Sequence, residues 1–369
     1  MNEINFTKPK INYSETNKIL AKVLKSGFIN QGIKTREFET KICNFLKIKY
    51  AVTTTSGTSA IFLALKAAGV KKNDEVIVPN ITFPATANAV KLAGAKPMLV
   101  DVNPESLLIN QKSLKKIISK KTKFIIPVHI SGRGNNITNI VKICKKNSIK
   151  IIEDAAEAFG SKINRKNLGS FGVAGCFSFA PNKLITTGQG GVVVTNSKHI
   201  FQNLKILKDQ GRVGKITGGD DKYVSLGFNF KFTDLQAAVG LSQIKNLNWR
   251  VKKLKKIHNF YLKNIKQNKN IKIIKFHLNK GELPLWTDIW CNYRNELYKF
   301  LKSKNIECRY YWKPLNLCPS YLTSFKKLEN SKKLQGKLMW LPSSLNITNN
   351  DQKKICNLIN FFYKNKNEK

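Results

Sequence analysis

The chain lacks any long apolar segment and has few metal-ligating side chains. No stretch approaches the roughly 18 uncharged apolar residues of a membrane-spanning helix, and the first residues lack the apolar block of a signal peptide. We therefore expect a cytoplasmic protein with no membrane partner. The four histidines are scattered, and the seven cysteines are odd in number and contain no Cys-x-x-Cys pair. This pattern favours neither a metal site nor a disulfide framework.

Acidic residues are also scarce. The chain has 22 Asp and Glu against 65 Lys and Arg, which gives a formal net charge of +43. Such an excess is typical of nucleic-acid-binding proteins. The lysines, however, are spread over the whole chain together with many asparagines and isoleucines, so we interpret the charge mainly as a bias of a genome rich in A and T. A nucleic-acid-binding function remains the less favoured alternative.

What the chain does contain is a repeated alternation of short apolar runs with helix-length segments. The runs lie at 51–52, 75–78, 97–101, 124–128 and 149–154, and the helices are expected at 60–68, 86–93, 112–118 and 137–146. This alternation predicts an α/β domain with a mostly parallel sheet, whose ligands bind beyond the carboxyl ends of the strands.

The remaining segments predict a second, smaller unit. We expect strands at 271–276, 285–290 and 306–312 and a closing helix at 350–363, which together suit a small α+β domain. The domains are expected at 1–248 and 249–369. Nearer the start, Ser14 is expected to cap a helix at 14–25, and later segments predict helices at 233–249 and 251–267.

One lysine, Lys183, lies in an unusual position for a charged side chain. Its loop joins two apolar runs, 176–179 and 191–194, that are typical of short buried strands. A lysine amine sheltered from water can become a nucleophile and form a Schiff base with a carbonyl such as that of pyridoxal 5'-phosphate (PLP). Lys183 is therefore the candidate cofactor anchor, although a lysine picked at random from this chain is most often a solvated surface charge.

Two other strand ends supply compatible groups. The loop Ser56-Gly57-Thr58-Ser59 opens a helix, where free N–H groups favour a phosphate, although such loops serve about as often as ordinary N-caps. Asp154 follows an apolar run and precedes small residues, so it could pair with a protonated pyridine nitrogen or simply cap the next turn. A phosphate loop, an aspartate and a lysine in this order are the parts that a PLP enzyme needs.

These segments resemble the PLP-dependent sugar-nucleotide aminotransferases of fold type I, the group that contains perosamine synthase. The resemblance covers nearly the whole chain and is most specific at 56–60, 79–88, 152–158, 229–238 and the loop of Lys183. It implies an aspartate aminotransferase-like fold with a large PLP-binding domain and a small C-terminal domain. It also implies a homodimer with shared active sites.

The resemblance assigns roles around the cofactor ring. Lys183 would hold PLP covalently and, once released, act as catalytic acid and base, while Asp154 would hold the pyridinium nitrogen. Phe83 would stack on the ring, and Glu157 would lie near its phenolic oxygen. The phosphate would be bound by Gly57, Thr58 and Ser178, with Asn229 reaching it from the other subunit.

The resemblance also implies the reaction. The donor is expected to be L-glutamate and the acceptor a nucleotide-linked keto-deoxyhexose, which is aminated at C4 because the sequence that follows Lys183 resembles the C4-acting members. The segment 309–314 is expected to face this substrate, with Tyr311, Lys313 and Asn316 as candidate contacts. The chain departs from the family's pattern at Val173, Gln189 and Asn316, and the last departure leaves the substrate open. A PLP-binding regulator or sensor without turnover is the alternative.

Overall fold

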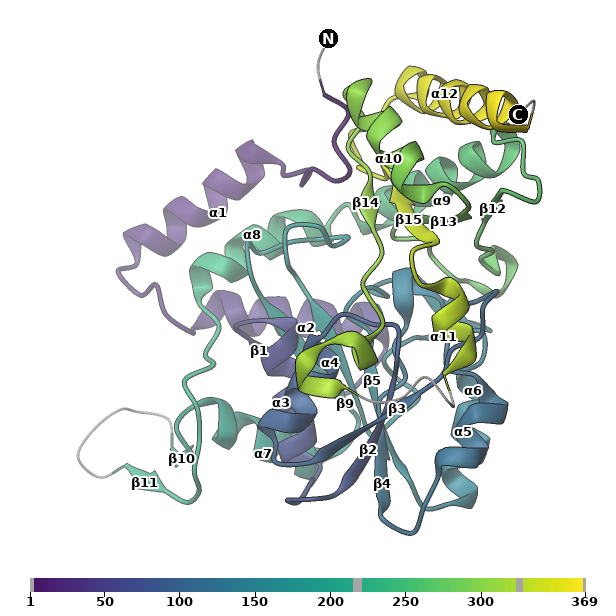
Figure 1. Ribbon diagram of the computed structural model, residues 1–369. Helices are drawn as coiled ribbons and strands as arrows, with labels where there is room; N and C mark the ends of the chain where they lie inside the picture. The colour runs from purple at the N-terminus through teal and green to yellow at the C-terminus, as the bar shows by residue number, and fades with distance from the viewer. Residues whose placement is uncertain (1–2, 215–220, 323–327, 368–369) are drawn as a thin grey trace.

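The central element of the fold is a seven-stranded sheet (Figure 1). The computed structural model describes residues 3–214, 221–322 and 328–367. In spatial order the strands are β1 (Tyr50–Thr54), β9 (Gly191–Thr195), β8 (Ala174–Ser178), β5 (Lys150–Asp154), β4 (Thr122–Ile125), β2 (Glu75–Pro79) and β3 (Lys96–Val100). The pairs from β8 to β3 are parallel, whereas β9 runs antiparallel to β8 and β1. The predicted mostly parallel sheet is confirmed.

Helices cover both faces of this sheet because alternate residues of each strand point to opposite sides. Phe124 and Ile152 pack in a cluster with α3 (Gly57–Ala67), α4 (Ala85–Leu92) and α7 (Lys198–Lys208). Ile125 and Ile151 pack on the other face with α5 (Gln111–Ile117) and α6 (Ile137–Lys146). The strands are apolar on both sides, which explains why they are continuous apolar runs in the sequence.

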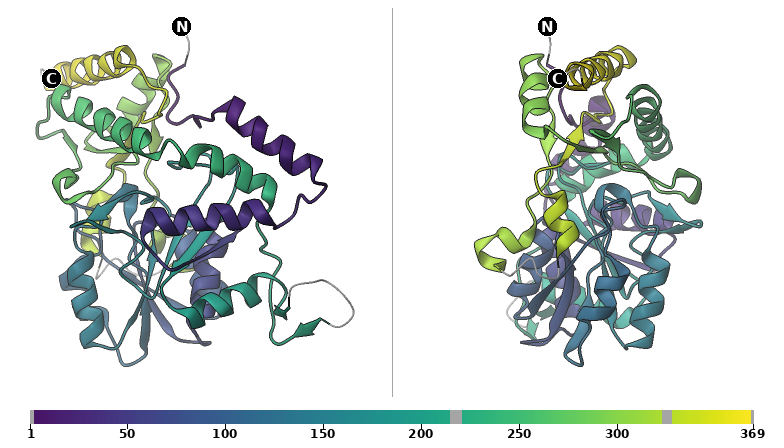
Figure 2. Two further views of the ribbon diagram at one scale, coloured as in Figure 1. Left: turned by 180° about the vertical axis from the view of Figure 1, so that it is seen from behind. Right: turned by 45° about the vertical axis from the view of Figure 1, so that its right-hand side comes forward.

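A second sheet of four antiparallel strands lies at one end of the molecule (Figure 1). Its order is β12 (Ile271–Ile273), β13 (Thr287–Cys291), β15 (Leu338–Leu341) and β14 (Arg309–Tyr310). It is accompanied by α9 (Leu247–Asn264), α10 (Arg294–Ser303) and α12 (Asn349–Asn367), and the purple N-terminal segment lies at the same end as α12 (Figure 2). One hydrophobic cluster runs from Phe177 on the central sheet to Ile289 on the second. The division into domains at residue 248 stays a prediction.

The remaining elements complete the molecule. Helices α2 (Ile33–Leu46) and α8 (Asp234–Ile244) pack against each other. The others are α1 (Tyr13–Lys25), α11 (Glu329–Leu334) and the short strands β6 (Lys162–Ile163), β7 (Lys166–Asn167), β10 (Arg212–Val213) and β11 (Lys222–Tyr223). Among the described residues, no helix combines the length and apolar character needed to span a bilayer.

Several expected boundaries differ from the structure. The cap of α1 is Asn12, whose side chain accepts a hydrogen bond from the Glu15 N–H, so the prediction of Ser14 as N-cap is wrong. The helix expected at 233–249 ends at Ile244. A turn at Lys245 and Asn246 separates it from α9, which begins at Leu247 and contains Arg250. Strand β15 was not expected.

Candidate active site

A cavity of about 420 Å³ lies where β5 and β8 end and α3 begins, a size typical of ligand pockets. Four of the polar side chains that line it with little exposure belong to Asp154, Glu157, Ser178 and Lys183, and we call these four the cavity floor. More exposed side chains line its opening, and we call Phe83, Arg309 and Tyr310 the cavity mouth. Other lining residues are Phe6, Ser56, Gly57, Thr58, Thr82, Gln189, Trp286, Trp312 and Trp340.

Lys183 is sheltered at the floor, as the sequence predicts. Its side chain is 13% exposed, and its Nζ lies 3.3 Å from Glu157 Oε1. The same nitrogen lies 5.0 Å from the centre of the Trp286 ring. The amine therefore points into the cavity towards a buried carboxylate, and its shelter from water is what is expected of a reactive lysine.

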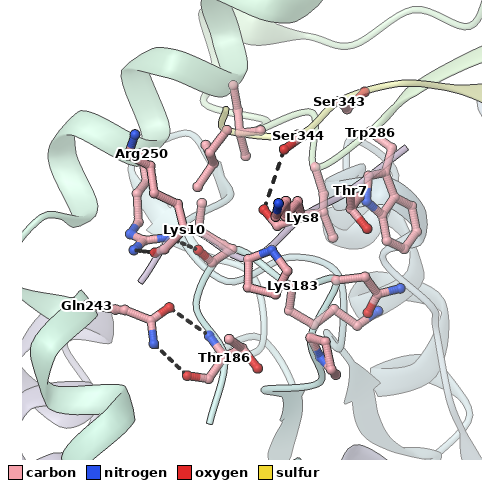
Figure 3. Close-up of a pocket in the computed structure, with 17 residues that line it drawn as sticks. Thr7, Lys8, Lys10, Lys183, Thr186, Gln243, Arg250, Trp286, Ser343 and Ser344 are labelled. Atoms are coloured by element: carbon pink, nitrogen blue, oxygen red, sulfur yellow. Dashed lines mark hydrogen bonds between the residues drawn. The ribbon is translucent and has the colours of Figure 1, made fainter. Parts of the chain in front are cut away.

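Two helices clamp the loop that carries Lys183 (Figure 3). From α8, the Gln243 side chain accepts from the Thr186 N–H at 3.1 Å and donates to the Thr186 carbonyl at 2.6 Å. From α9, the Arg250 guanidinium donates to the carbonyls of Leu184 and Lys10, and burial lowers its pKa to about 10. These bonds replace solvent for the backbone of the loop and hold it against α8 and α9.

Asp154 is the last residue of β5 and is 5% exposed. Its Oδ2 accepts a hydrogen bond from Thr86 Oγ1 at 2.7 Å, and its Oδ1 accepts from the Ala156 N–H at 3.2 Å. Burial raises the pKa of this carboxyl, and the two hydrogen bonds only partly oppose it. Asp154 therefore does cap the following turn, and it also presents a desolvated carboxylate that a cation in the cavity would stabilise.

Glu157 is held from the side opposite to Lys183. Its Oε2 accepts from the Ser131 N–H at 2.7 Å, and Ser131 has the uncommon left-handed φ of 52°. Burial raises the pKa of Glu157, and the positive charge of Lys183 opposes this shift. Ser131 Oγ in turn donates to Asp288, which forms a buried ion pair with Arg133. This network ties the floor to the second sheet.

The predicted phosphate loop forms the start of α3. Ser56 caps the helix in a reciprocal pair with Ser59, which leaves the first N–H groups of α3 at the cavity. A Cβ at Gly57 would lie 2.9 Å from Ser178 Cβ, so glycine permits the helix start to approach β8 closely. A helix N-terminus beside a serine hydroxyl suits a phosphate. Anchor amine, buried carboxylate and phosphate loop thus share one cavity, and the residues present fit PLP.

The three substrate contacts proposed from the sequence do not line this cavity, and they stay predictions. Tyr311 is 5% exposed and its ring lies tilted against that of Trp340 with the ring centres 4.2 Å apart, Lys313 is exposed, and the Asn316 side chain accepts from the Asn80 amide at 2.9 Å. The segment 309–314 does face the cavity, but through Arg309, Tyr310 and Trp312. Asn229 is exposed and does not line the cavity of its own chain, and its reach into a partner's site stays a prediction.

Sequence reasoning missed several residues that shape the site. Thr86 lies within a segment that the resemblance quotes, so a hydroxyl facing Asp154 could have been suspected. Gln243, Arg250 and Trp286 carry no local signal, because each acts on a distant part of the chain. Among the described residues, no group of three His, Cys, Asp or Glu side chains could hold a metal ion.

A sheltered lysine, a buried aspartate and a phosphate loop around one cavity are the arrangement expected of a PLP-dependent enzyme. The chain belongs to the DegT/DnrJ/EryC1/StrS aminotransferase family, which it matches over residues 10–360. The expected PLP-dependent sugar-nucleotide aminotransferase family, the fold type and the cofactor are thereby confirmed.

Individual relatives agree with this family. The chain is 34% identical to GDP-perosamine synthase of Escherichia coli O157:H7, with 91% of this chain and 92% of that one covered. It is 32% identical to UDP-4-amino-4,6-dideoxy-N-acetyl-beta-L-altrosamine transaminase of Campylobacter jejuni, covering 86% and 85%. Among solved structures, Helicobacter pylori PseC, an aminotransferase involved in the biosynthesis of pseudoaminic acid, superposes with a TM-score of 0.92 at 26% identity, covering 99% and 100%.

Proposed function

We propose that this protein transfers an amino group from L-glutamate to C4 of a nucleotide-linked keto-deoxyhexose, a step in making sugars for a surface polysaccharide or glycan. The single observation that carries the proposal is the sheltered Lys183 amine, which lies beside Glu157 in the same cavity as Asp154 and the start of α3. The names of two relatives refer to sugars linked to a nucleoside diphosphate, GDP in one and UDP in the other, and the second name describes a 4-amino-4,6-dideoxy sugar. These names support the acceptor class and the C4 position.

Two floor residues, Lys183 and Asp154, have tasks in such a reaction. PLP, when bound, would act as an electron sink that makes the proton on the carbon bearing the amino group removable. Lys183 Nζ would accept that proton as a base and would supply a proton as an acid. Asp154 would keep the ring nitrogen protonated, and its hydrogen bond from Thr86 orients the carboxylate. The N–H groups at the start of α3 would hold the phosphate.

We also propose a homodimer with shared sites. Large apolar side chains are exposed on α1, in the turn that follows it and at the start of α2, including Tyr13, Leu24, Phe28 and Ile33. An exposed apolar group of this kind is typical of a protein–protein interface. In such a dimer Asn229 of each chain would approach the phosphate loop of the other. Light scattering that shows a monomer at working concentrations would contradict the dimer.

A visible spectrum tests the proposed chemistry directly. Purified protein loaded with PLP is expected to be yellow, to lose this band when L-glutamate is added, and to regain it when a nucleotide-linked 4-ketohexose is added. If glutamate changes nothing and other amino acids do, the donor is wrong. If no ketosugar of a panel restores the band, the regulator or sensor alternative is favoured.

The nucleic-acid alternative rests on the formal net charge of +43. Binding through general charge should weaken steeply with salt. Tight binding of duplex DNA at physiological salt would favour this alternative, whereas weak binding there would leave the charge without a nucleic-acid role.

A further inference from the structure

Two cationic side chains occur among the described residues that line the cavity, Lys183 and Arg309. Lys183 faces the buried carboxylate of Glu157. Arg309 begins β14, the edge strand of the second sheet, and 49% of its side chain is exposed. Arg309 therefore places a partly exposed guanidinium at the mouth, whereas Lys183 lies at the floor.

The guanidinium of Arg309 is held in place from two sides. Its Nε and Nη2 donate to Glu307 Oε1 at 3.3 and 3.1 Å, and the other oxygen of Glu307 accepts from the Phe6 N–H at 2.9 Å. The guanidinium carbon also lies 5.0 Å from the centre of the Phe6 ring. Arginine carries five N–H donors in a planar fork, so donors remain for a further anion.

The size of the cavity decides which part of a substrate reaches Arg309. A volume of about 420 Å³ lies near the lower end of the range of ligand pockets, so we expect the cofactor and the reacting part of the sugar to fill most of it. The link between sugar and nucleoside therefore has to cross the mouth. Phe83 and Tyr310 offer aromatic faces beside that path, at 54% and 37% exposure.

We propose that Arg309 binds the diphosphate of the nucleotide-linked acceptor and so selects substrates that carry one. The proposal rests on the proposed function above. A guanidinium fork matches two phosphate oxygens at once, and such bidentate bonds are stronger than those of an ammonium group. Glu307 competes with the diphosphate for the same guanidinium, and its carboxylate repels the ligand.

Binding of GDP and UDP to the PLP-loaded protein tests this assignment by calorimetry. For whichever of the two binds the wild type, Arg309→Gln is expected to raise the Kd by about 10- to 100-fold, and Arg309→Lys by less. Glu307→Gln should lower the Kd by about two- to threefold, because it keeps an acceptor for Phe6 but removes the competing charge. Arg165→Gln removes the same charge from an exposed turn away from the cavity and serves as the matched control.

Kinetics separate this proposal from the proposed function. Arg309→Gln should raise the KM for the nucleotide sugar by a similar factor, whereas Arg165→Gln should leave this KM and the glutamate half reaction, followed by the visible band, unchanged. Equal Kd values in Arg309→Gln and Arg165→Gln would overturn the role of Arg309, as would a wild type that binds neither nucleotide. A wild type that does not react with glutamate would instead contradict the proposed donor reaction.

Discussion

The floor and the mouth of the cavity differ in how they are built. The floor lies at the ends of neighbouring strands of the central sheet, where Asp154 is the last residue of β5 and Ser178 the last of β8. The mouth brings together Phe83 before α4 and Arg309 on the second sheet, and Arg309 is held by the N-terminal segment. Chemistry therefore depends on the rigid sheet, whereas substrate selection depends on contacts between distant segments.

The largest expected effect is the loss of turnover when Lys183 at the floor is replaced. Lys183→Ala removes both the cofactor anchor and the proton carrier, so turnover should fall by about 10⁴-fold or more. The fold should persist, because the loop is clamped by Gln243 and Arg250 and not by the lysine. Steady-state rates measure the loss of turnover, and far-ultraviolet circular dichroism measures whether the fold persists. Turnover within tenfold of wild type would contradict the role of Lys183.

The next prediction concerns Asp154. Asp154→Asn should lower turnover by about 10²- to 10⁴-fold, since the amide cannot hold a charged ring nitrogen. The PLP-free variant should nevertheless be more stable than the PLP-free wild type at neutral pH. Burial raises the pKa of Asp154 above its ordinary 3.8, so the ionised carboxylate costs folding free energy once the pH exceeds the folded pKa.

The sign of this stability effect can be checked with thermal melts across pH. Because the folded pKa is the higher one, the favourable contribution of Asp154 is complete below pH 3.8 and is lost as the pH rises through the folded value. The advantage of Asp154→Asn should therefore grow from acid to neutral pH. An advantage that shrinks over this range would mean that the carboxylate is stabilised, and not destabilised, by its site.

The features that could be predicted from the sequence differ between the floor and the mouth in the same way. The central sheet, the lysine loop, Asp154 and Ser178 could be predicted because each is a local pattern: an apolar run and the polar residue that ends it. Glu157 and Phe83 were implied only by the resemblance. The part of the mouth on the second sheet could be placed only as a segment, 309–314, because alternation along a two-residue strand does not reveal which side chains turn inward. Asn316 illustrates this limit, since its amide pairs with Asn80, a partner 236 positions away.

A smaller effect is expected from the clamp that supports the floor. Gln243→Met keeps the length of the side chain but leaves the N–H and carbonyl of Thr186 without their partner, which should lower the free energy of unfolding by about 1–3 kcal/mol. Gln335→Met, at an exposed position, is the control and should change it by less than about 0.5 kcal/mol. Urea unfolding measures both. Equal values for the two variants would show that the loop does not need the clamp.

The last prediction contrasts the two sheets by pH. His258 on α9 hydrogen-bonds Thr287 of the second sheet, and burial lowers its pKa from 6.5 to about 3. Its contribution to stability is present above pH 6.5 and is lost as the pH falls towards 3, by about 1.4 kcal/mol per pH unit. The floor carboxylates act in the opposite direction. His258→Phe should therefore flatten the acid side of the plot of unfolding free energy against pH, because an uncharged ring binds no proton on unfolding. It should leave the effect of Asp154→Asn on stability unchanged. An unchanged acid limb in urea unfolding between pH 5 and 6.5 would mean that His258 is protonated in the folded protein.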